Sequence, residues 1–434
     1  MDDGAAAGRA ERLGFTALGF PAFRAYFGAT LVTNSAQFVQ SAGIGWISWE
    51  VTGSAAGVAA IGFLNVLPYT LLTLHSGLLT DRFGGRRMVV LSLVTSGIAL
   101  TLLGIAGVAW GIPAAALGLA AFILGVLGVI GGPGGFTIVN DILPRHAIPS
   151  ALALIFLDVN LGRILGGIVG GIALALLPGG WTLVLAGVLM LPPALAIRRL
   201  PTRATPPAEV ATRATGALVA PIVEAAGVAR RSTPLALLYV MTSVMGSLGQ
   251  GYNYQLPVTA VELGAGADGL GLLTAVVGVG GLVVGLILER LMRSLGHGRT
   301  VWLGTWLAAG GMMLAGTAGS LPVAALGMGI AGAGFAIYAA CTLALIQALA
   351  PAALRGRLTA LFSLLYWGLM PAGALIGGIV AEAVGARTTL LLFGIGILAT
   401  SAVTMVGRPG VRRLRLGPDG HPISATAARP AEAA

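Results

Sequence analysis

The stretch "GLLTDRFGGRR", Gly77 to Arg87, places four charged side chains between two long apolar runs. The whole chain of 434 residues is 56% hydrophobic and only 9% charged, whereas soluble domains carry about 25% charged residues. So few charges cannot cover a water-facing surface, and apolar runs of about 20 residues match the thickness of a bilayer core. The strands of a membrane barrel would be roughly 10 residues long with alternating polarity. The sequence therefore predicts an all-α membrane protein.

Apolar runs and the breaks between them predict twelve transmembrane helices. The segment between the sixth and the seventh is rich in Pro, Thr and Arg and predicts a cytoplasmic linker with a short amphipathic helix around 219–228. We expect an N-terminal six-helix half over 1–198, this linker over 199–232, a C-terminal six-helix half over 233–407, and a partly disordered cytoplasmic tail over 408–434. The predicted spans are 24–48, 55–79, 88–110, 113–139, 149–177, 181–198, 233–258, 269–291, 300–319, 322–348, 358–382 and 388–407.

The basic residues predict the orientation of the chain in the membrane. All 25 are Arg, and they lie between the apolar runs rather than on one face, which argues against nucleic-acid binding despite the net charge of +10. With the N-terminus in the cytoplasm, every arginine except Arg163 and Arg387 falls on the cytoplasmic side, as the positive-inside rule requires. We expect a multi-pass protein of the cell (cytoplasmic) membrane with both termini cytoplasmic and no cleaved signal peptide. The quoted stretch is then the cytoplasmic loop between spans two and three.

The sequence shows little of the chemistry of an enzyme or a metal site. The single cysteine, Cys341, lies in an apolar run, and the four histidines are scattered. There is no lysine for a Schiff base or a phosphate-binding loop. A polytopic membrane enzyme would need a cluster of His, Asp or Glu at one membrane face, and we see none. We therefore expect no cofactor, no metal and no enzymatic activity. A sensor without transport activity stays an alternative.

The two predicted halves repeat each other in parallel. The run "GGIV" at 166–169 occurs again at 377–380, in the corresponding predicted span and in the same orientation. Two parallel six-helix repeats are the arrangement of one large class of transporter folds. The loop residues Gly77, Asp81 and Arg82 likewise recur as Gly285, Glu289 and Arg290.

The opening stretch resembles the loop signature of the major facilitator superfamily, Gly-x-x-x-Asp-Arg-x-Gly-x-Arg-Arg/Lys. The resemblance implies a gate that locks the cytoplasmic side closed in the outward-facing state. In it the acidic residue caps the start of span eleven, where a helix N-terminus favours an anion, and the arginines pair with a carboxylate at the end of span four. A loop that merely orients the chain is the alternative, although it would not require the Gly and Asp spacing. The residues implied are Gly77, Asp81, Arg82, Gly84, Arg86, Arg87 and, ending span four, Asp141.

A second stretch, "GRILGGIVGG" in span five, resembles the antiporter motif of facilitator exporters, Gly-x-x-x-Gly-Pro-x-x-Gly-Gly. Gly167 stands where that family has Pro, so a bend that depends on Pro is not expected here. Ordinary packing of small residues, which lets helices approach closely, is the alternative. The matching positions are Gly162, Gly166, Gly170 and Gly171.

Further stretches are similar to the twelve-span drug, macrolide and siderophore efflux branch of this superfamily. The resemblance covers residues 18–407 and implies proton antiport that exports an amphipathic small molecule such as an antibiotic or a siderophore. An importer or uniporter of the same fold is the alternative. The partners implied are the small-molecule substrate, protons and membrane lipid, and we expect a monomer. The stretches are "PAFRAYF" (21–27), "WEVTGSAAGVA" (49–59), "NLGRILG" (160–166) and "PAALRGRLTAL" (351–361).

Ionisable residues inside spans are candidates for proton coupling because each costs about 2.5–3.5 kcal/mol on insertion scales at the bilayer centre. Asp158 is predicted to lie about 13 Å into span five, near its middle, at 1.5 Å per residue. A proton-carrying role and a structural ion pair with Arg163 or another span are equally compatible with the sequence. Histidine is the side chain that most readily changes charge near physiological pH, so His75, near the cytoplasmic end of span two, is a further candidate. A hydrogen bond from His75 to a neighbouring helix is the alternative.

Amides and aromatic residues in spans one, two and seven predict a cavity for a ligand with polar and aromatic parts. The two tyrosines suit an interfacial belt equally well. The candidate cavity residues are Asn34, Gln37, Asn65, Gln250, Tyr252, Asn253 and Tyr254.

Overall fold

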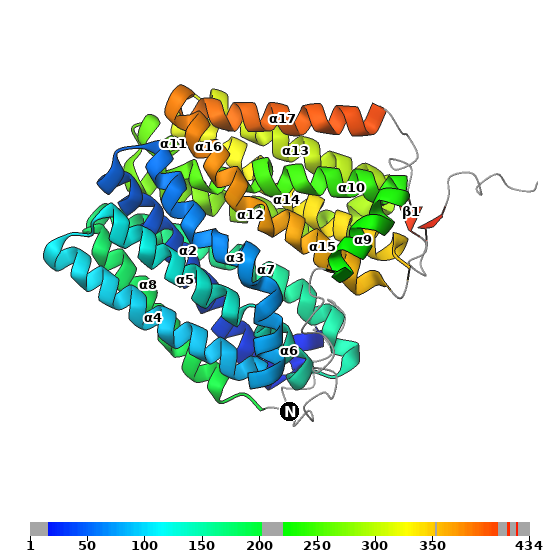
Figure 1. Ribbon diagram of the computed structural model, residues 1–434, viewed down its shortest axis with the longest axis horizontal. Coiled ribbons are helices and arrows are strands. Elements are labelled where there is room, and N and C mark those ends of the chain that lie inside the picture. The colour runs from blue at the N-terminus through cyan, green and yellow to red at the C-terminus, as the bar shows by residue number, and fades with distance from the viewer. Residues whose placement is uncertain (1–15, 202–219, 352–353, 407–414, 417–421, 424–434) are drawn as a thin grey trace, which may run out of the picture. The chain divides into compact units, whose positions relative to one another are not determined.

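The chain is helical almost throughout the part that the structure describes (Figure 1). This computed structural model describes residues 16–201, 220–351, 354–406, 415–416 and 422–423. Residues 202–219 of the predicted linker and most of the predicted disordered tail lie outside this part. The helices are α2 (Pro21–Thr52), α3 (Ala55–Phe83), α4 (Gly85–Trp110), α5 (Ala114–Gly131), α6 (Gly134–Ile142), α7 (Ile148–Leu176), α8 (Gly179–Arg198), α9 (Ala220–Arg231), α10 (Thr233–Val244), α11 (Leu256–Glu262), α12 (Gly266–Leu295), α13 (His297–Thr317), α14 (Leu321–Leu349), α15 (Arg355–Gly368), α16 (Met370–Val384) and α17 (Ala386–Val406).

Short turns and one strand pair complete the described elements. Two 3-10 turns, Thr16–Gly19 and Arg145–Ala147, precede α2 and α7. A π-helical turn, Met245–Gly249, and a third 3-10 turn, Tyr252–Tyr254, lie between α10 and α11. The strands β1 (Arg415–Leu416) and β2 (Pro422–Ile423) pair antiparallel.

Local sequence explains where the first helices end. Gly53 ends α2 in the left-handed conformation, with φ of 59°, and its N–H donates to the Trp49 carbonyl. The Ser54 side chain then accepts a hydrogen bond from the backbone N–H of Gly57 and caps α3. Gly84 separates α3 from α4 with φ of 88°. Only glycine adopts such backbone angles without strain, so the charged loop requires a glycine at this position.

Nine helical stretches of the described residues are long and apolar enough to cross a membrane. They coincide with all the predicted spans except the first, seventh and ninth. α2 and α13, at the first and ninth, are long helices of lower hydropathy. The seventh is helical but broken into α10, the two irregular turns and α11. The all-helical membrane fold is therefore confirmed, and the number of twelve crossings stays a prediction.

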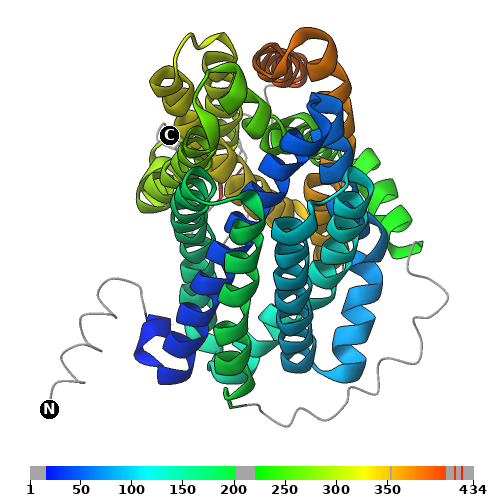
Figure 2. The same cartoon turned by 90° about the vertical axis from the view of Figure 1, so that its left-hand side faces the viewer.

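The first of two compact units comprises Met1–Thr215 and Leu256–Gly278. In it α2 packs against α7 and α8, α4 against α5 and α8, and α3 against α5. Figure 2 shows these helices, drawn from blue to green, running side by side. Residues 256–278 pack with this unit, although they lie in the predicted C-terminal half. The core is built of small and aliphatic side chains without exposed surface, among them Ala36, Val39, Leu100, Leu117, Ala121 and Leu183.

The second unit comprises Gly216–Gln255 and Val279–Ala434. α13 packs against α14 and α17, and α16 packs against α17. α9 lies against α10 and α15 and buries Ala225 and Ala229. The Glu224 carboxylate of α9 forms an ion pair with Arg357 of α15. The amphipathic helix predicted in the linker is therefore confirmed.

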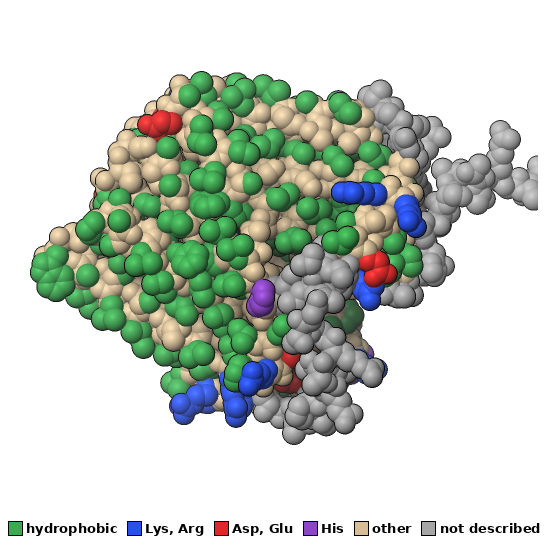
Figure 3. Space-filling view, in the orientation of Figure 1, with side chains coloured by type: hydrophobic (Ala, Val, Ile, Leu, Met, Phe, Trp, Pro, Cys, Tyr) green, Lys and Arg blue, Asp and Glu red, His purple; other side chains and the backbone are tan. Residues whose placement is uncertain are grey.

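Charged and apolar side chains separate on the surface. Figure 3 shows a face covered mainly by hydrophobic side chains, while in the first unit arginines gather near the end where Figure 1 labels α6. This is the distribution expected of helices whose sides contact lipid and whose ends reach the headgroups.

Candidate functional site

The candidate proton site is a buried carboxylate between α2 and α7. Asp158 of α7 has no exposed surface. The Asn34 side-chain amide of α2 donates a hydrogen bond to its Oδ2 at 3.1 Å. Its Oδ1 accepts no hydrogen bond of normal geometry from a described residue, although the Thr30 hydroxyl of α2 lies close to the carboxyl. An ionised oxygen without a partner is costly in an apolar interior, so a carboxyl in this position is a candidate for carrying a proton.

Glycines on one face of α7 bring Asn34 within reach of Asp158. A Cβ on Gly162 would lie 2.5 Å from the Asn34 Cβ, and a Cβ on Gly166 would lie 2.4 Å from the Ser35 carbonyl oxygen. Both distances are shorter than any normal contact, so α2 and α7 approach this closely only because these residues lack side chains. Gly170 continues the same face, where a Cβ would lie 3.3 Å from that of Ala42.

The other face of α7 is fitted to the first turns of α12. A Cβ on Gly171 would lie 2.8 Å from the Cα of Gly271, and a Cβ on Gly167 would lie 2.9 Å from the Gly271 carbonyl oxygen. α7 continues without a break through Gly167, the position at which the related motif has Pro. The glycines of this stretch therefore allow close packing at two helix crossings, α7 with α2 and α7 with α12. Gly167 belongs to the crossing with α12. Gly271 was not singled out by the sequence because one glycine among 68 carries no signal.

Arg163, the expected partner of Asp158, is directed elsewhere. Its guanidinium lies over the Phe38 ring, 4.8 Å from the ring centroid, a cation–π contact. Among the described residues Asp158 forms no ion pair with Arg163. Asn160, which shares a helix face with Arg163, donates to the Phe156 carbonyl of its own helix at 2.9 Å. A structural Asp158–Arg163 pair is therefore not formed in this structure.

His75, unlike Asp158, is exposed rather than buried. It lies in α3 with an exposed side chain, and this side chain makes no hydrogen bond or ion pair with any other described residue. Nothing in the first unit gives it the desolvated surroundings of Asp158. Its proposed place in proton coupling rests on its residue type alone.

The charged loop makes contacts other than the expected ion pairs. Arg86 donates to the Leu200 carbonyl at 2.6 Å, just past the end of α8, and the Arg82 guanidinium lies 5.3 Å from the centroid of the Phe83 ring. Neither of them, nor Arg87, forms an ion pair with Asp141 among the described residues. Asp141 is half-buried near the end of α6, and Asp81 and Gly84 are exposed.

The junction of α4 and α6 holds the loop through backbone contacts that the sequence did not single out. A Cβ on Gly85 would lie 2.7 Å from the Thr137 Cβ and 3.0 Å from the Gly134 Cα. The run "GGPGG" at 131–135, which separates α5 from α6, was the available signal. Gly77, in contrast, has open space around its Cα, so the structure gives no steric reason for glycine there.

A second polar cluster lies in the second unit, where two helices break at the same place. The Gln250 amide donates to the Tyr366 hydroxyl at 2.8 Å, and both side chains are buried. Around it the backbones of the two breaks touch: a Cβ on Gly246 would lie 2.1 Å from the Leu365 carbonyl oxygen, and one on Gly373 would lie 1.9 Å from that of Ser247. Discontinuous helices line the substrate sites of many transporters.

Aromatic rings extend this second cluster. Tyr252 is 1% exposed and stacks on Phe335, with ring centroids 5.0 Å apart and planes 8° from parallel. Tyr366 stacks in the same way between Tyr338 and Phe362. Tyr252 is therefore a packed residue rather than a member of an interfacial belt. Tyr366 and Phe335 were not predicted, because isolated aromatic residues in apolar runs resemble ordinary core.

Of the remaining predicted cavity residues, Asn65 contacts another helix and Asn253 makes a local contact. Asn65 donates to the Ala121 carbonyl at 2.9 Å, Asn253 donates to the Gln250 carbonyl at 3.0 Å, Gln37 is exposed, and Tyr254 is half-buried. Asn34, Gln37 and Asn65 belong to the first unit, whereas the predicted residues of 250–254 belong to the second. A single cavity shared by both groups stays a prediction.

Known proteins resemble the chain over most of its length. The family model described as transmembrane secretion effector matches residues 13–412. The multidrug efflux pump Tap of Mycolicibacterium fortuitum is 25% identical over 380 residues, which cover 86% of this chain and 91% of that protein.

Solved structures share the fold at low sequence identity. The nucleoside transporter NupG has a TM-score of 0.70 at 13% identity, with 89% of this chain and 98% of that chain covered. The human organic anion transporter MFSD10 (TETRAN) has a TM-score of 0.62 at 18% identity, with 88% and 98% covered. The chain belongs to the transmembrane secretion effector family, a family of membrane transporters within the major facilitator superfamily.

Proposed function

We propose that the chain exports an amphipathic small molecule, such as an antibiotic or a siderophore, by proton antiport with alternating access. The observation that carries this proposal is the buried Asp158 carboxyl, which has one oxygen bound by Asn34 and the other without a hydrogen bond of normal geometry from a described residue. The name of the efflux relative from Mycolicibacterium fortuitum supports the direction of transport. The proposed substrate class rests on the resemblance of the sequence to the drug, macrolide and siderophore efflux branch.

The proposed cycle uses Asp158 as the group that changes charge. In the outward-facing state a proton from outside binds Oδ1 and neutralises the carboxyl. In the inward-facing state the proton leaves to the cytoplasm, and the ionised carboxylate keeps its bond to the Asn34 amide. Because no described arginine holds the carboxylate in its ionised form, both protonation states are accessible as the surroundings change.

The substrate is proposed to contact the Gln250–Tyr366 cluster of the second unit. A buried amide next to stacked aromatic rings suits a ligand with both polar and planar apolar parts. Uptake or uniport is favoured by one observation, the Gly at position 167 where exporters have Pro.

Reconstituted transport tests the proposed function. The purified protein in proteoliposomes should move a labelled antibiotic or siderophore against its gradient when a pH gradient is imposed, and a pH-sensitive dye should report proton movement in the opposite direction. Collapse of the gradient with a protonophore should stop accumulation. Downhill transport that is indifferent to the pH gradient would instead establish a uniporter.

The charged loop is proposed to close the cytoplasmic side, and Asp81→Asn should weaken that closure. We expect export to fall several-fold while expression persists, because Asp81 is exposed. Accessibility of introduced cysteines on the cytoplasmic side, measured with and without substrate, reports the closure. Asp268→Asn removes an equally exposed carboxylate from the first turn of α12 and should change neither quantity. Identical labelling in the Asp81 variant and the wild type would leave the loop with an orienting role only.

The proposed orientation places both termini and α9 in the cytoplasm. On a Cys341→Ala background, a cysteine at Val223, which is 61% exposed on α9, should be unreactive toward an impermeant maleimide added to intact cells. A cysteine at Trp110, 85% exposed at the end of α4, should react. The reverse pattern of labelling contradicts this topology.

A further inference from the structure

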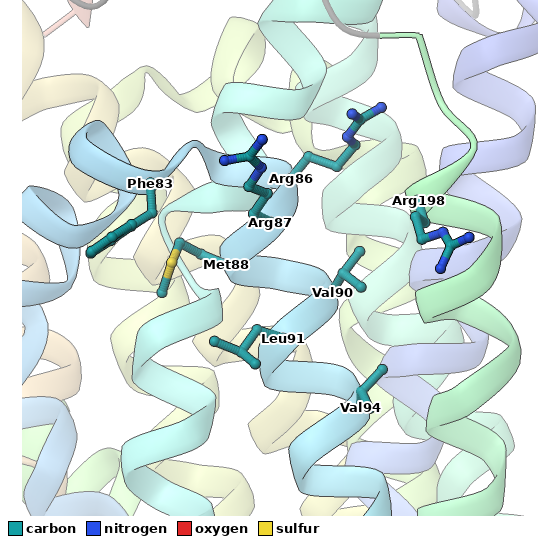
Figure 4. A pocket seen from close by; sticks show the side chains of 8 residues that line it. All are labelled: Phe83, Arg86, Arg87, Met88, Val90, Leu91, Val94 and Arg198. Atoms are coloured by element: carbon teal, nitrogen blue, oxygen red, sulfur yellow. The ribbon is translucent and has the colours of Figure 1, made fainter.

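A pocket of about 690 Å³ lies in the first unit where α4 begins. Figure 4 shows Arg86 and Arg87 at the first turn of α4 and Arg198 across from them on α8, with apolar side chains along α4 between and below them. The lining contains three guanidinium groups and no carboxylate. This pocket is distinct from the buried Asp158 site and from the Gln250–Tyr366 cluster, none of whose residues line it.

The charges of this arginine pocket are not neutralised by the described part of the protein. Arg86 is held by its bond to the Leu200 carbonyl, whereas Arg87 and Arg198 are exposed. Neither Arg87 nor Arg198 has a carboxylate within 4.0 Å in the described part of the chain. Guanidinium groups that line one pocket without a counter-charge repel one another and favour an anion, for which the Arg fork supplies two parallel donors.

The depth of the pocket in the membrane follows from the length of α4. Its 26 residues span about 39 Å, which exceeds the roughly 30 Å of a bilayer hydrocarbon core. The exposed Trp110 at its far end is the kind of residue that anchors at the membrane interface. The first turn, with Arg86 and Arg87, then lies at the level of the phosphate groups on the opposite side.

The apolar wall of the pocket continues along the outside of α4. Val90, Leu91 and Val94 line the pocket below the arginines. Leu91 is 52% exposed, and Ile98 and Leu102 extend the same exposed stripe toward the membrane centre. Exposed aliphatic side chains on a membrane helix contact acyl chains. The site thus has a cationic head region and an apolar track leading away from it.

We propose that this pocket binds one anionic phospholipid, with its phosphate on Arg87 and Arg198 and an acyl chain along Leu91. Basic pockets between membrane helices on the cytoplasmic side are suited to such headgroups. A zwitterionic phospholipid carries its own ammonium group into the cluster and binds more weakly. The lipid joins α4 to α8 at the end where Arg86 bonds the Leu200 carbonyl, just past α8.

Native mass spectrometry of the delipidated full-length protein tests the proposal. Phosphatidylglycerol and phosphatidylcholine with identical acyl chains are titrated separately, and the fraction of protein with one bound lipid is measured. We expect phosphatidylglycerol to bind with an affinity about tenfold higher, and the double variant Arg87→Gln/Arg198→Gln to lose this preference. The matched control, Arg230→Gln/Arg231→Gln, removes two exposed arginines of α9 and should keep it.

Two further measurements distinguish binding of a whole lipid from binding of an anion alone, and one of them does not require a variant to fold. Leu91→Gln alters only the apolar track and should weaken phosphatidylglycerol binding. The ability of inorganic phosphate to displace the bound lipid should stay unchanged in this variant. A photoactivatable phosphatidylglycerol should label residues 83–94 or 198 in the wild-type protein, which does not depend on a variant folding. Equal binding of the two lipids, full preference in the Arg87/Arg198 variant, or labelling confined to other helices would each overturn the proposal.

Discussion

We expect Asp158→Asn to abolish transport driven by a pH gradient and to preserve exchange of labelled for unlabelled substrate. The amide is isosteric with the carboxyl but cannot release a proton, so a step that requires Asp158 to alternate between charged and neutral forms is lost. Exchange needs no net proton movement, and the carbonyl oxygen of the new amide can still accept the hydrogen bond that Asn34 donates to Asp158. Both activities are measured in the same proteoliposomes, with and without an imposed gradient.

The controls for this prediction separate proton coupling from a general loss of function. Asp268→Asn makes the same chemical change at an exposed position and should retain gradient-driven transport. Arg163→Ala should lower stability modestly through loss of its contact with Phe38, and adding it to Asp158→Asn should not restore coupling. Full gradient-driven accumulation by Asp158→Asn would move the proton site elsewhere, with His75 as the next residue to change.

We expect Gly166→Val to prevent the normal packing of α7 against α2 and to cause the largest loss of stability among the substitutions considered. Its Cβ would lie 2.4 Å from the Ser35 carbonyl oxygen and 2.6 Å from the Phe38 Cβ. The backbone oxygen cannot rotate away, so the two helices must separate. Overpacking of this kind costs about 3 kcal/mol, and separation also breaks the Asn34–Asp158 hydrogen bond. Thermal unfolding in detergent and size-exclusion chromatography measure the effect.

Glycines in open positions provide the matched comparison. Gly28 of α2 and Gly310 of α13 are exposed and would meet nothing within 4 Å of an added Cβ. Alanine at either position should leave stability unchanged or raise it by up to about 1 kcal/mol through helix propensity. Equal midpoints of thermal unfolding for Gly166→Val and the wild type would show that the α2–α7 crossing has more room than the Cβ distances of Gly166 allow.

The sequence predicted the features that follow from periodic or one-dimensional patterns. Apolar runs placed the helices, and the charged loop after the second of them indicated the superfamily. The span-five glycines indicated close packing, although not that Gly167 and Gly171 face one neighbour and Gly162 and Gly166 another. That division depends on how α7 is rotated about its own axis between α2 and α12. The spacing of the glycines shows which of them share a face of α7, but not which helix each face contacts.

The side-chain pairings of the candidate site were not predictable in the same way. Arg163 is near Asp158 in sequence, yet its guanidinium stacks on Phe38, and the partner of Asp158 comes from α2. The break in the seventh helix was also missed, because the amides and tyrosines of residues 250–254 were interpreted as cavity residues within a regular span. Its cause is tertiary: the glycines there let its backbone touch that of a second broken helix, α15–α16.

The break in the seventh helix also lies beside one of the two points at which the chain passes between the compact units. The chain passes from the second compact unit to the first between Gln255 and Leu256, immediately after the turn Tyr252–Tyr254, and returns at Gly278 within the continuous helix α12. A regular helix behaves as a stiff rod, whereas a joint of irregular turns absorbs rotation through a few backbone angles. Of the two covalent links between the units, the one through α12 is therefore a continuous rod. The link at residues 245–254 is an irregular turn, which is held within the second unit by the close approach of Gly246 to the Leu365 carbonyl oxygen.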